Sequence, residues 1–215
     1  MDAQVKGSEV KRVAVEPLRM RVAQFEIVGT APYVQQRFSE KAKRIIEENQ
    51  AAGSTTKKGK NREAKNFKAL YEAAVYVSDE GWHGQPAAGY RNALIDACRV
   101  AGFEMTRAKM SLFVLADGFD RLDATPLVRI KSGKPREIRH AVRNATGVPD
   151  IRVRAMFERW SVTLRIQYDA DQFTAEDVAN LLVRAGAQVG IGEGRPFSKK
   201  SAGMGWGAFA PRGEA

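Results

Sequence analysis

Six glycines at every second position near the end of the chain constrain its fold more than any other feature. They form two triplets, Gly190-Ile191-Gly192-Glu193-Gly194 and Gly203-Met204-Gly205-Trp206-Gly207, on either side of a polar and basic centre. Glycine adopts positive φ without a steric penalty and allows another backbone or a ligand to come close. A mobile hairpin with a solvated tip is the alternative, but the regular order favours a loop that cradles phosphate.

This loop does not match the known nucleotide-binding glycine motifs. No Gly-Lys-Ser or Gly-Lys-Thr stands at the Walker A spacing, and no strand-turn-helix context supports a dinucleotide site. We therefore expect contacts with a phosphate backbone from Arg195, Lys199 and Lys200, and close approach of that backbone at Gly192, Gly194, Gly203 and Gly205.

The charge balance indicates a polyanionic partner. The chain of 215 residues has 35 Lys and Arg against 25 Asp and Glu, a net charge of +10 at pH 7. Such an excess favours nucleic acid. A membrane surface is the weaker alternative, because no basic amphipathic helix with an aromatic or aliphatic face is present.

Cysteine, histidine and hydropathy predict the cellular setting. The N-terminus has no apolar signal core and no run of about 18 apolar residues exists, so we expect a cytoplasmic protein. The lone cysteine, Cys98, excludes an intramolecular disulfide and lies beside a helical apolar stripe, which favours a buried core residue over a nucleophile. Two scattered histidines and one cysteine do not form a zinc pattern, and we expect neither a metal nor a cofactor.

Apolar periodicity and capping residues predict one α+β domain. An N-terminal arm covers 1–20, the domain 21–210, and a tail 211–215, with insertions at about 52–65 and 129–150. Strands are predicted at 21–28, 74–77, 112–116, 127–130, 151–157, 160–168, 187–191 and 206–209, and helices at 39–50, 66–74, 86–101 and 174–185.

The two insertions carry most of the remaining basic residues. Both contain turn formers, so we expect a loop at 52–65 and, at 129–150, an excursion from the domain body that contacts phosphate. An acidic segment at 117–123 reads as a solvated turn and lacks the ligand pattern of a calcium loop. The candidate phosphate contacts in the insertions are Lys57, Lys58, Lys60, Arg62, Arg129, Lys131, Lys134, Arg136, Arg139 and Arg143.

The order strand, helix, strand, glycine-rich loop and strand at the end of the chain is typical of a ferredoxin-like or RRM-like fold. Residues 190–207 resemble the C-terminal glycine-rich motif of the RAMP superfamily of CRISPR-associated RNA-binding proteins. Residues 25–32 look like the first strand and following loop of that superfamily. Residues 85–94 are similar to its segment of proline, small residues and a helix. The whole chain also resembles stand-alone proteins of tailed bacteriophages related to the crRNA-binding backbone subunit.

The resemblance implies an RRM-like palm with inserted fingers and thumb that grips a nucleic-acid backbone and stacks side by side along the strand. It adds Arg91 to the candidate contacts, and a host cytoplasm if the protein is phage-encoded. The turn after Arg195 is longer than the corresponding turn of the family. RAMP endonucleases commonly use a histidine, and His83 is the candidate here, although no acid/base partner is evident.

Three functions follow in order of preference. The first is non-catalytic, sequence-nonspecific binding of single-stranded RNA or DNA by a homo-oligomer or filament, with no membrane partner. The second is a metal-independent endonuclease that uses His83, with Lys199 or Lys200 beside the scissile phosphate. The third is a protein-interaction module that imitates a RAMP subunit. Bases could stack on exposed aromatic side chains, for which the candidates are Tyr33, Phe38, Trp82, Trp160 and Trp206.

Overall fold

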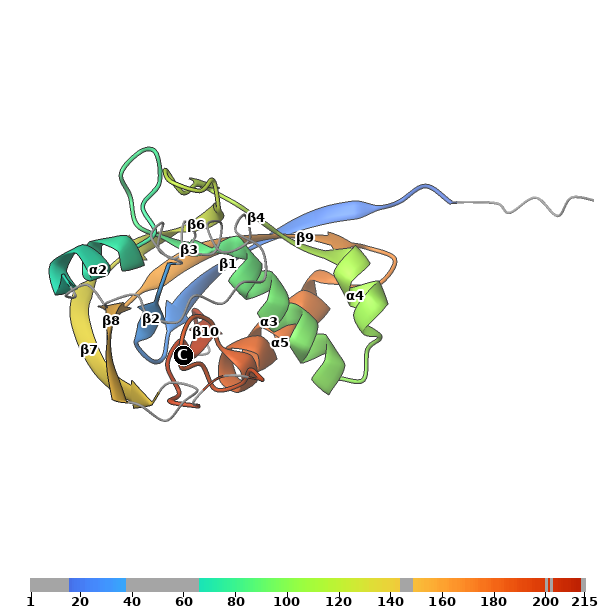
Figure 1. Cartoon of the computed structure of the whole chain (residues 1–215). Helices are drawn as coiled ribbons and strands as arrows, with labels where there is room; N and C mark the ends of the chain where they lie inside the picture. Colours follow the sequence, from blue (N-terminus) through green and yellow to red (C-terminus); the bar gives the residue numbers. More distant parts are fainter. Residues whose placement is uncertain (1–15, 38–65, 144–148, 200, 202, 214–215) are drawn as a thin grey trace, which may run out of the picture.

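A computed structural model describes residues 16–37, 66–143, 149–199, 201 and 203–213. It is a mixed α/β structure with two antiparallel sheets and four α-helices among these residues (Figure 1). Several predictions lie outside the described part: the helix at 39–50, the basic loop at 52–65, most of the N-terminal arm, and Phe38 and Lys200.

The larger sheet has the ninth strand at its centre. The order is β10-β1-β9-β6-β3, while β4 pairs with the other half of β9 and β5 pairs with β6. All of these pairs are antiparallel. The strands are β1 (Met20–Gly29), β3 (Gly84–Pro86), β4 (Leu112–Leu115), β5 (Gly118–Phe119), β6 (Pro126–Ser132), β9 (Ser161–Asp169) and β10 (Phe209–Pro211).

The central pair follows the alternation in the sequence. β1 and β9 pair from Met20↔Asp169 to Val28↔Ser161. Ile27 and Leu164 are fully buried on one face. Since side chains alternate along a strand, the polar Glu26 and Thr163 lie opposite each other on the other face. The predicted strands at 21–28 and 160–168 are confirmed.

Helices cover one face of this sheet. α3 (Ala87–Val100) and α5 (Ala175–Arg184) contact each other and the strands β4, β6 and β10 between them (Figure 1). Thr174 and Asp177 form a reciprocal capping box, which satisfies backbone donors at the start of α5. The short α4 (Met105–Ser111), which was not predicted, follows α3.

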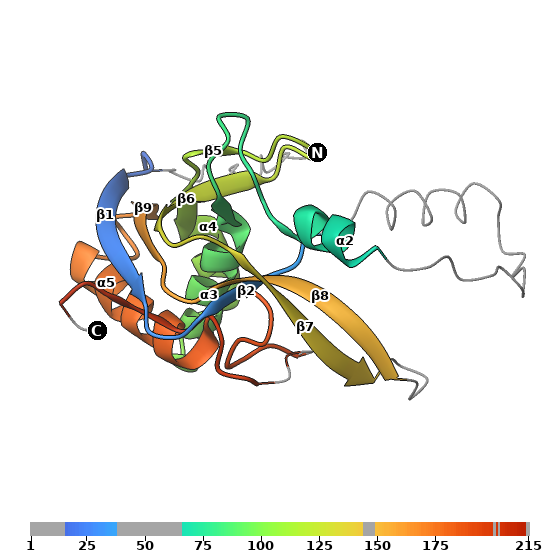
Figure 2. The same cartoon turned by 90° about the vertical axis from the view of Figure 1, so that its left-hand side faces the viewer.

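The second sheet contains a basic hairpin. Its order is β2 (Tyr33–Gln35), β8 (Pro149–Phe157) and β7 (Arg136–Arg143), and the β7–β8 hairpin projects from the body (Figure 2). The segment predicted at 129–150 as a basic insertion that leaves the domain body is therefore largely a regular hairpin and not a loop. Ile138 and Ala155 are buried on opposite faces of the hairpin. The arginines along both strands partly hide the alternation of apolar and polar residues in the sequence.

The chain between α5 and β10 also differs from the prediction. Residues 187–191 are not a strand, because α5 continues into a π-helical turn, η1 (Ala185–Val189). Gly186 does not stop the helix. A Cβ on Gly186 would lie only 1.9 Å from the Phe209 carbonyl oxygen, so glycine at this position allows close packing instead. The closing strand begins at Phe209 and not at Trp206.

Residues 74–77 are also not a strand. α2 (Phe67–Ala74) agrees with the predicted helix at 66–74. The segment after it contributes only isolated bridges, Val77↔His83 and Ser78↔Asp120.

Candidate nucleic-acid interface

The β7–β8 hairpin lies between two other parts of the protein. On one face Ala155 packs against Tyr71 of α2, whose hydroxyl donates to the Pro135 carbonyl at 2.8 Å. On the other face Ile138 clusters with Val34 and with Trp206 of the C-terminal segment. The base of the hairpin is thus held on both sides, while Arg136, Arg139 and Arg152 are exposed to solvent.

Four exposed cations lie on this hairpin and the turn before it. Arg136 and Arg139 donate to Glu158 at 2.7 Å and Glu137 at 2.6 Å. Because both arginines are about half exposed, at 54% and 55%, these pairs contribute little and can exchange for phosphate. Among the described residues no carboxylate pairs with the other two cations, which are Lys134 and Arg152.

The glycine-rich segment forms a compact loop against β2. Ile191 N–H donates to the Gly207 carbonyl at 3.0 Å, and Glu193 N–H to the Val34 carbonyl at 2.8 Å. The two triplets are joined again where Trp206 N–H donates to the Gly194 carbonyl at 3.2 Å. All six glycines have φ between 63° and 76°, as their spacing predicted.

Other protein atoms lie so close to most of these glycines that a Cβ would overlap with them. A Cβ on Gly192 would lie 2.5 Å from the Val34 carbonyl oxygen, and one on Gly207 only 1.8 Å from that of Ile191. A Cβ on Gly194 would meet the Trp206 ring at 2.6 Å. Gly203 and Gly205 have no such close neighbour. Among the described glycines of the loop, Gly203 and Gly205 therefore stand at open positions.

The cations of the loop differ in their surroundings. Arg195 turns back on the loop, since its guanidinium donates to the carbonyls of Gly192 at 3.0 Å and Phe197 at 3.1 Å. Lys199 is exposed. Arg195 therefore holds the loop together in this structure, whereas Lys199 is an exposed cation among the described residues of the loop.

An ion pair joins the loop to the hairpin. Arg154 of β8 is buried and donates to both carboxylate oxygens of Glu193, one of them at 2.9 Å. The side chain of Glu193 is 36% exposed. Sequence reasoning missed this pair, because the two residues are far apart in the chain and each stands in a basic or polar run.

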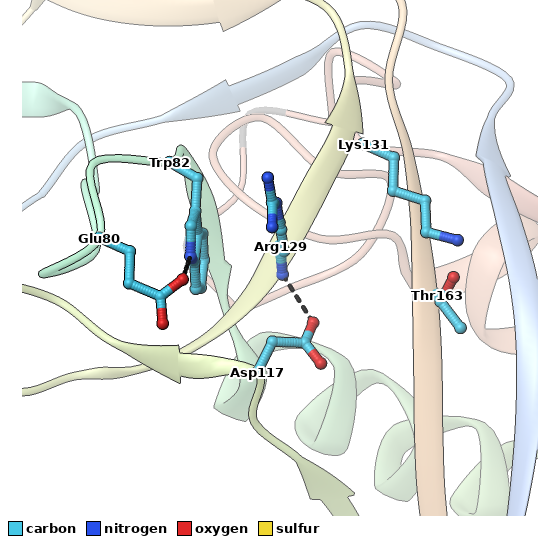
Figure 3. A pocket seen from close by; sticks show the side chains of 6 residues that line it. All are labelled: Glu80, Trp82, Asp117, Arg129, Lys131 and Thr163. Carbon is cyan, nitrogen blue, oxygen red and sulfur yellow. Dashed lines mark hydrogen bonds between the residues drawn. The ribbon is translucent and has the colours of Figure 1, made fainter.

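Two further candidates lie on the uncovered face of the large sheet. The Arg129 guanidinium stands over the Trp82 ring at 5.8 Å, and Lys131 Nζ donates to Glu26 Oε1 at 2.8 Å. Hydrogen bonds from Lys131 and then Thr163 lower the pKa of Glu26, so this carboxylate stays charged. Figure 3 shows the shallow pocket of about 260 Å³ that these side chains line together with Glu80 and Asp117.

Arg91 has a different environment. Its Nε donates to the Leu112 carbonyl at 2.9 Å, a second nitrogen donates to the Lys109 carbonyl, and the guanidinium stands over the Phe113 ring at 5.1 Å. These contacts tie α3 to the junction of α4 and β4. The side chain has a structural role there, away from the hairpin.

The catalytic candidate His83 is half-buried. Its ring meets Phe157 edge-on at 5.9 Å, and burial lowers its pKa, against a smaller opposing hydrogen bond to the Tyr76 backbone. This environment favours a neutral, packed imidazole. Burial likewise raises the pKa of the Cys98 thiol to about 11, as expected for a core residue and not for a nucleophile.

The acidic segment at 117–123 is not simply a solvated turn. Asp120 is buried and pairs with the buried Arg37 at 3.1 Å. Its carboxylate also accepts from the backbone N–H groups of Val77, Leu122 and Asp123. The aspartate spacing gave no sign of its distant cationic partner, which precedes the segment by more than eighty residues.

The predicted cations therefore fall into separate groups. Lys134, Arg136, Arg139 and the backbone of Arg143 belong to the hairpin, Arg129 and Lys131 to the open sheet face, and Arg195 and Lys199 to the loop. The loop contacts the hairpin, whereas Arg91 stands apart. The candidates at Lys57, Lys58, Lys60, Arg62 and Lys200 lie outside the described residues.

Comparisons with known proteins leave the family open. No family model matches the chain, and no curated protein gives a significant match. Among the described residues, no helix is long and apolar enough to cross a membrane. The same part of the chain contains no group of three His, Cys, Asp or Glu residues placed to hold a metal ion.

Proposed function

We propose that this protein binds single-stranded nucleic acid through the phosphate backbone, without reading the base sequence. The observation that carries the proposal is the β7–β8 hairpin, which projects from the body (Figure 2). Its Arg136, Arg139 and Arg152, and Lys134 in the turn before it, are exposed. Exposed cations on an extended element attract a polyanion through released counterions. Such contacts carry no sequence information.

The neighbouring loop extends this surface. His140 lies opposite Arg152 in the hairpin and meets Trp206 at 5.0 Å between ring centroids. The exposed Lys199 and the open positions at Gly203 and Gly205 belong to the same loop as Trp206. We infer that a strand runs along the hairpin and reaches the second half of the loop.

The strand order supports a finer description of the fold. β10-β1-β9 followed by β4 and β6, with α3 and α5 on one face, fits a ferredoxin-like palm with the hairpin as an inserted finger. We further propose a relationship to the RAMP superfamily and side-by-side assembly along a strand, in a bacteriophage or CRISPR-related process. The short, glycine-dominated motifs described above motivate this part.

The test is a binding assay with labelled oligonucleotides of about 16 nucleotides, as RNA and as DNA and in several base compositions. At about 50 mM salt we expect binding of all compositions with dissociation constants within a few-fold of each other, and loss of affinity towards about 200 mM. No binding at low salt, or binding of one sequence alone, would contradict the proposal. A duplex of the same sequence serves as the comparison, and we expect it to bind more weakly.

A further inference from the structure

The open face of the large sheet holds a hollow that the proposed contacts with the phosphate backbone of nucleic acid do not use. It encloses about 260 Å³ between the Trp82 indole and the side chains of Lys131 and Thr163 (Figure 3). Pockets for drug-sized ligands have about 300–1,000 Å³. The hollow is therefore of a size for one planar ring, with any sugar and phosphate outside it.

Trp82 is held as a fixed platform. A Cβ on Gly118 would stand 2.8 Å from the indole ring, and one on Gly84 would stand 3.1 Å from it, so the ring lies directly on these two strands. Its Nε1 donates to Glu80 at 3.1 Å. A ring fixed in this way loses little conformational freedom when a ligand stacks on it.

Arg129 extends this platform. Its guanidinium stands over the indole at 5.8 Å and lies between Trp82 on one side and Lys131 and Thr163 on the other (Figure 3). Its backbone N–H donates to Asp117 at 2.9 Å, and Asp117 also accepts from Arg165 at 3.0 Å. Guanidinium planes and aromatic rings are the groups on which proteins stack unpaired bases.

The charges of the hollow select its ligand. Glu80 and Asp117 line it beside Arg129 and Lys131, so an anionic phosphate inside would lie against two carboxylates. A nucleobase is planar and uncharged, and its amino and imino groups can donate to carboxylates. Lys131, which is 49% exposed, stands at the side where the phosphate of that nucleotide would emerge.

We propose that this hollow holds one unpaired base of the bound strand, stacked on the Trp82–Arg129 platform. The inference rests on the proposed function and adds a contact to the base on the sheet face. The strand then touches the protein at two places, the hairpin cations and this platform.

The test compares a base-bearing oligonucleotide with an abasic strand of equal length, for the wild type, Trp82→Ala and the control Phe119→Ala. Phe119 is an exposed aromatic on β5 that does not line the hollow. Trp82→Ala should weaken binding of the base-bearing strand on the order of 5- to 100-fold and leave the abasic strand unchanged. Phe119→Ala should change neither.

Equal affinity of Trp82→Ala and wild type for the base-bearing strand would overturn the base site. Failure of the wild type to bind either strand would instead overturn the proposed function. If Trp82→Ala does not fold, photocrosslinking of the wild type to a strand with 5-bromouracil decides the matter. A crosslink at Trp82 supports the site, and crosslinks only at other residues, or none, contradict it.

Discussion

Two glycines of the C-terminal loop, Gly207 and Gly205, differ in the space that surrounds them. The φ of Gly207 is 68°, and a Cβ would stand 1.8 Å from the Ile191 carbonyl oxygen. Gly205, two residues earlier, has a similar φ of 73° but open space around the Cβ position. A substitution at Gly205 therefore introduces backbone strain alone, whereas one at Gly207 introduces backbone strain together with steric overlap.

We therefore predict different costs for the same substitution at these glycines. Gly205→Ala should lower the free energy of unfolding by about 1 kcal/mol, from the left-handed backbone alone. Gly207→Ala should lower it by about 3 kcal/mol, because the Ile191 backbone must also move. Urea denaturation of both variants measures the difference. Equal losses would show that the close contact at Gly207 does not limit the loop.

At this scale the sequence predicted conformation better than contact. The alternating glycines indicated a loop that uses the conformational freedom of glycine, and all six have positive φ. The sequence could not indicate that Val34, Ile191 and Trp206 would occupy the space beside these glycines, because those contacts depend on how β2 and the two halves of the loop pack together. Arg195 illustrates the same limit, since its guanidinium binds carbonyls of its own loop.

At the scale of elements, the Arg154–Glu193 pair couples the hairpin to the loop. Arg154 is only 4% exposed and Glu193 supplies both of its carboxylate acceptors. Glu193→Gln leaves a buried cation without its counter-charge, and we predict a loss of about 2 kcal/mol in the free energy of unfolding.

A matched control lies on the same hairpin. Glu158 pairs with Arg136 at the surface, where the two side chains are 64% and 54% exposed. Glu158→Gln should cost no more than about 0.5 kcal/mol. The double variant Arg154→Met with Glu193→Gln should regain much of the loss, because the unpaired charge is removed. A loss at Glu193 no larger than at Glu158 would mean that the pair does not couple the two elements.

The elements were predictable where periodicity was clean and flanked by turn residues. β1, β9 and α5 agree with the prediction, and Thr174 caps its helix as expected. The sequence predicted a basic loop at the hairpin, because arginines interrupt its apolar positions. η1 was taken for a strand because a π-helical turn has no periodicity of its own over five residues.

At the scale of the whole molecule, exposed cations lie both on the hairpin and on the helical side. The basic hairpin and α4 lie at opposite ends in Figure 1. The helical side also carries exposed cations, among them Arg107 and Lys109 on α4 and Arg184 on α5. If net charge alone drove binding, the hairpin side and the helical side would contribute equally to it. The proposal instead assigns the phosphate contacts to the hairpin side.

The salt dependence of binding distinguishes these two readings most directly. For single strands, the slope of log K against log salt changes by about 0.7 for each phosphate neutralised. Substituting Lys134, Arg139 and Arg152 by alanine should reduce the slope by about 2 and weaken binding to all base compositions alike. The same three-charge change at Arg107, Lys109 and Arg184 should leave the slope nearly unchanged. Equal slopes for the two triple variants would contradict a hairpin interface and reduce the interaction to net charge.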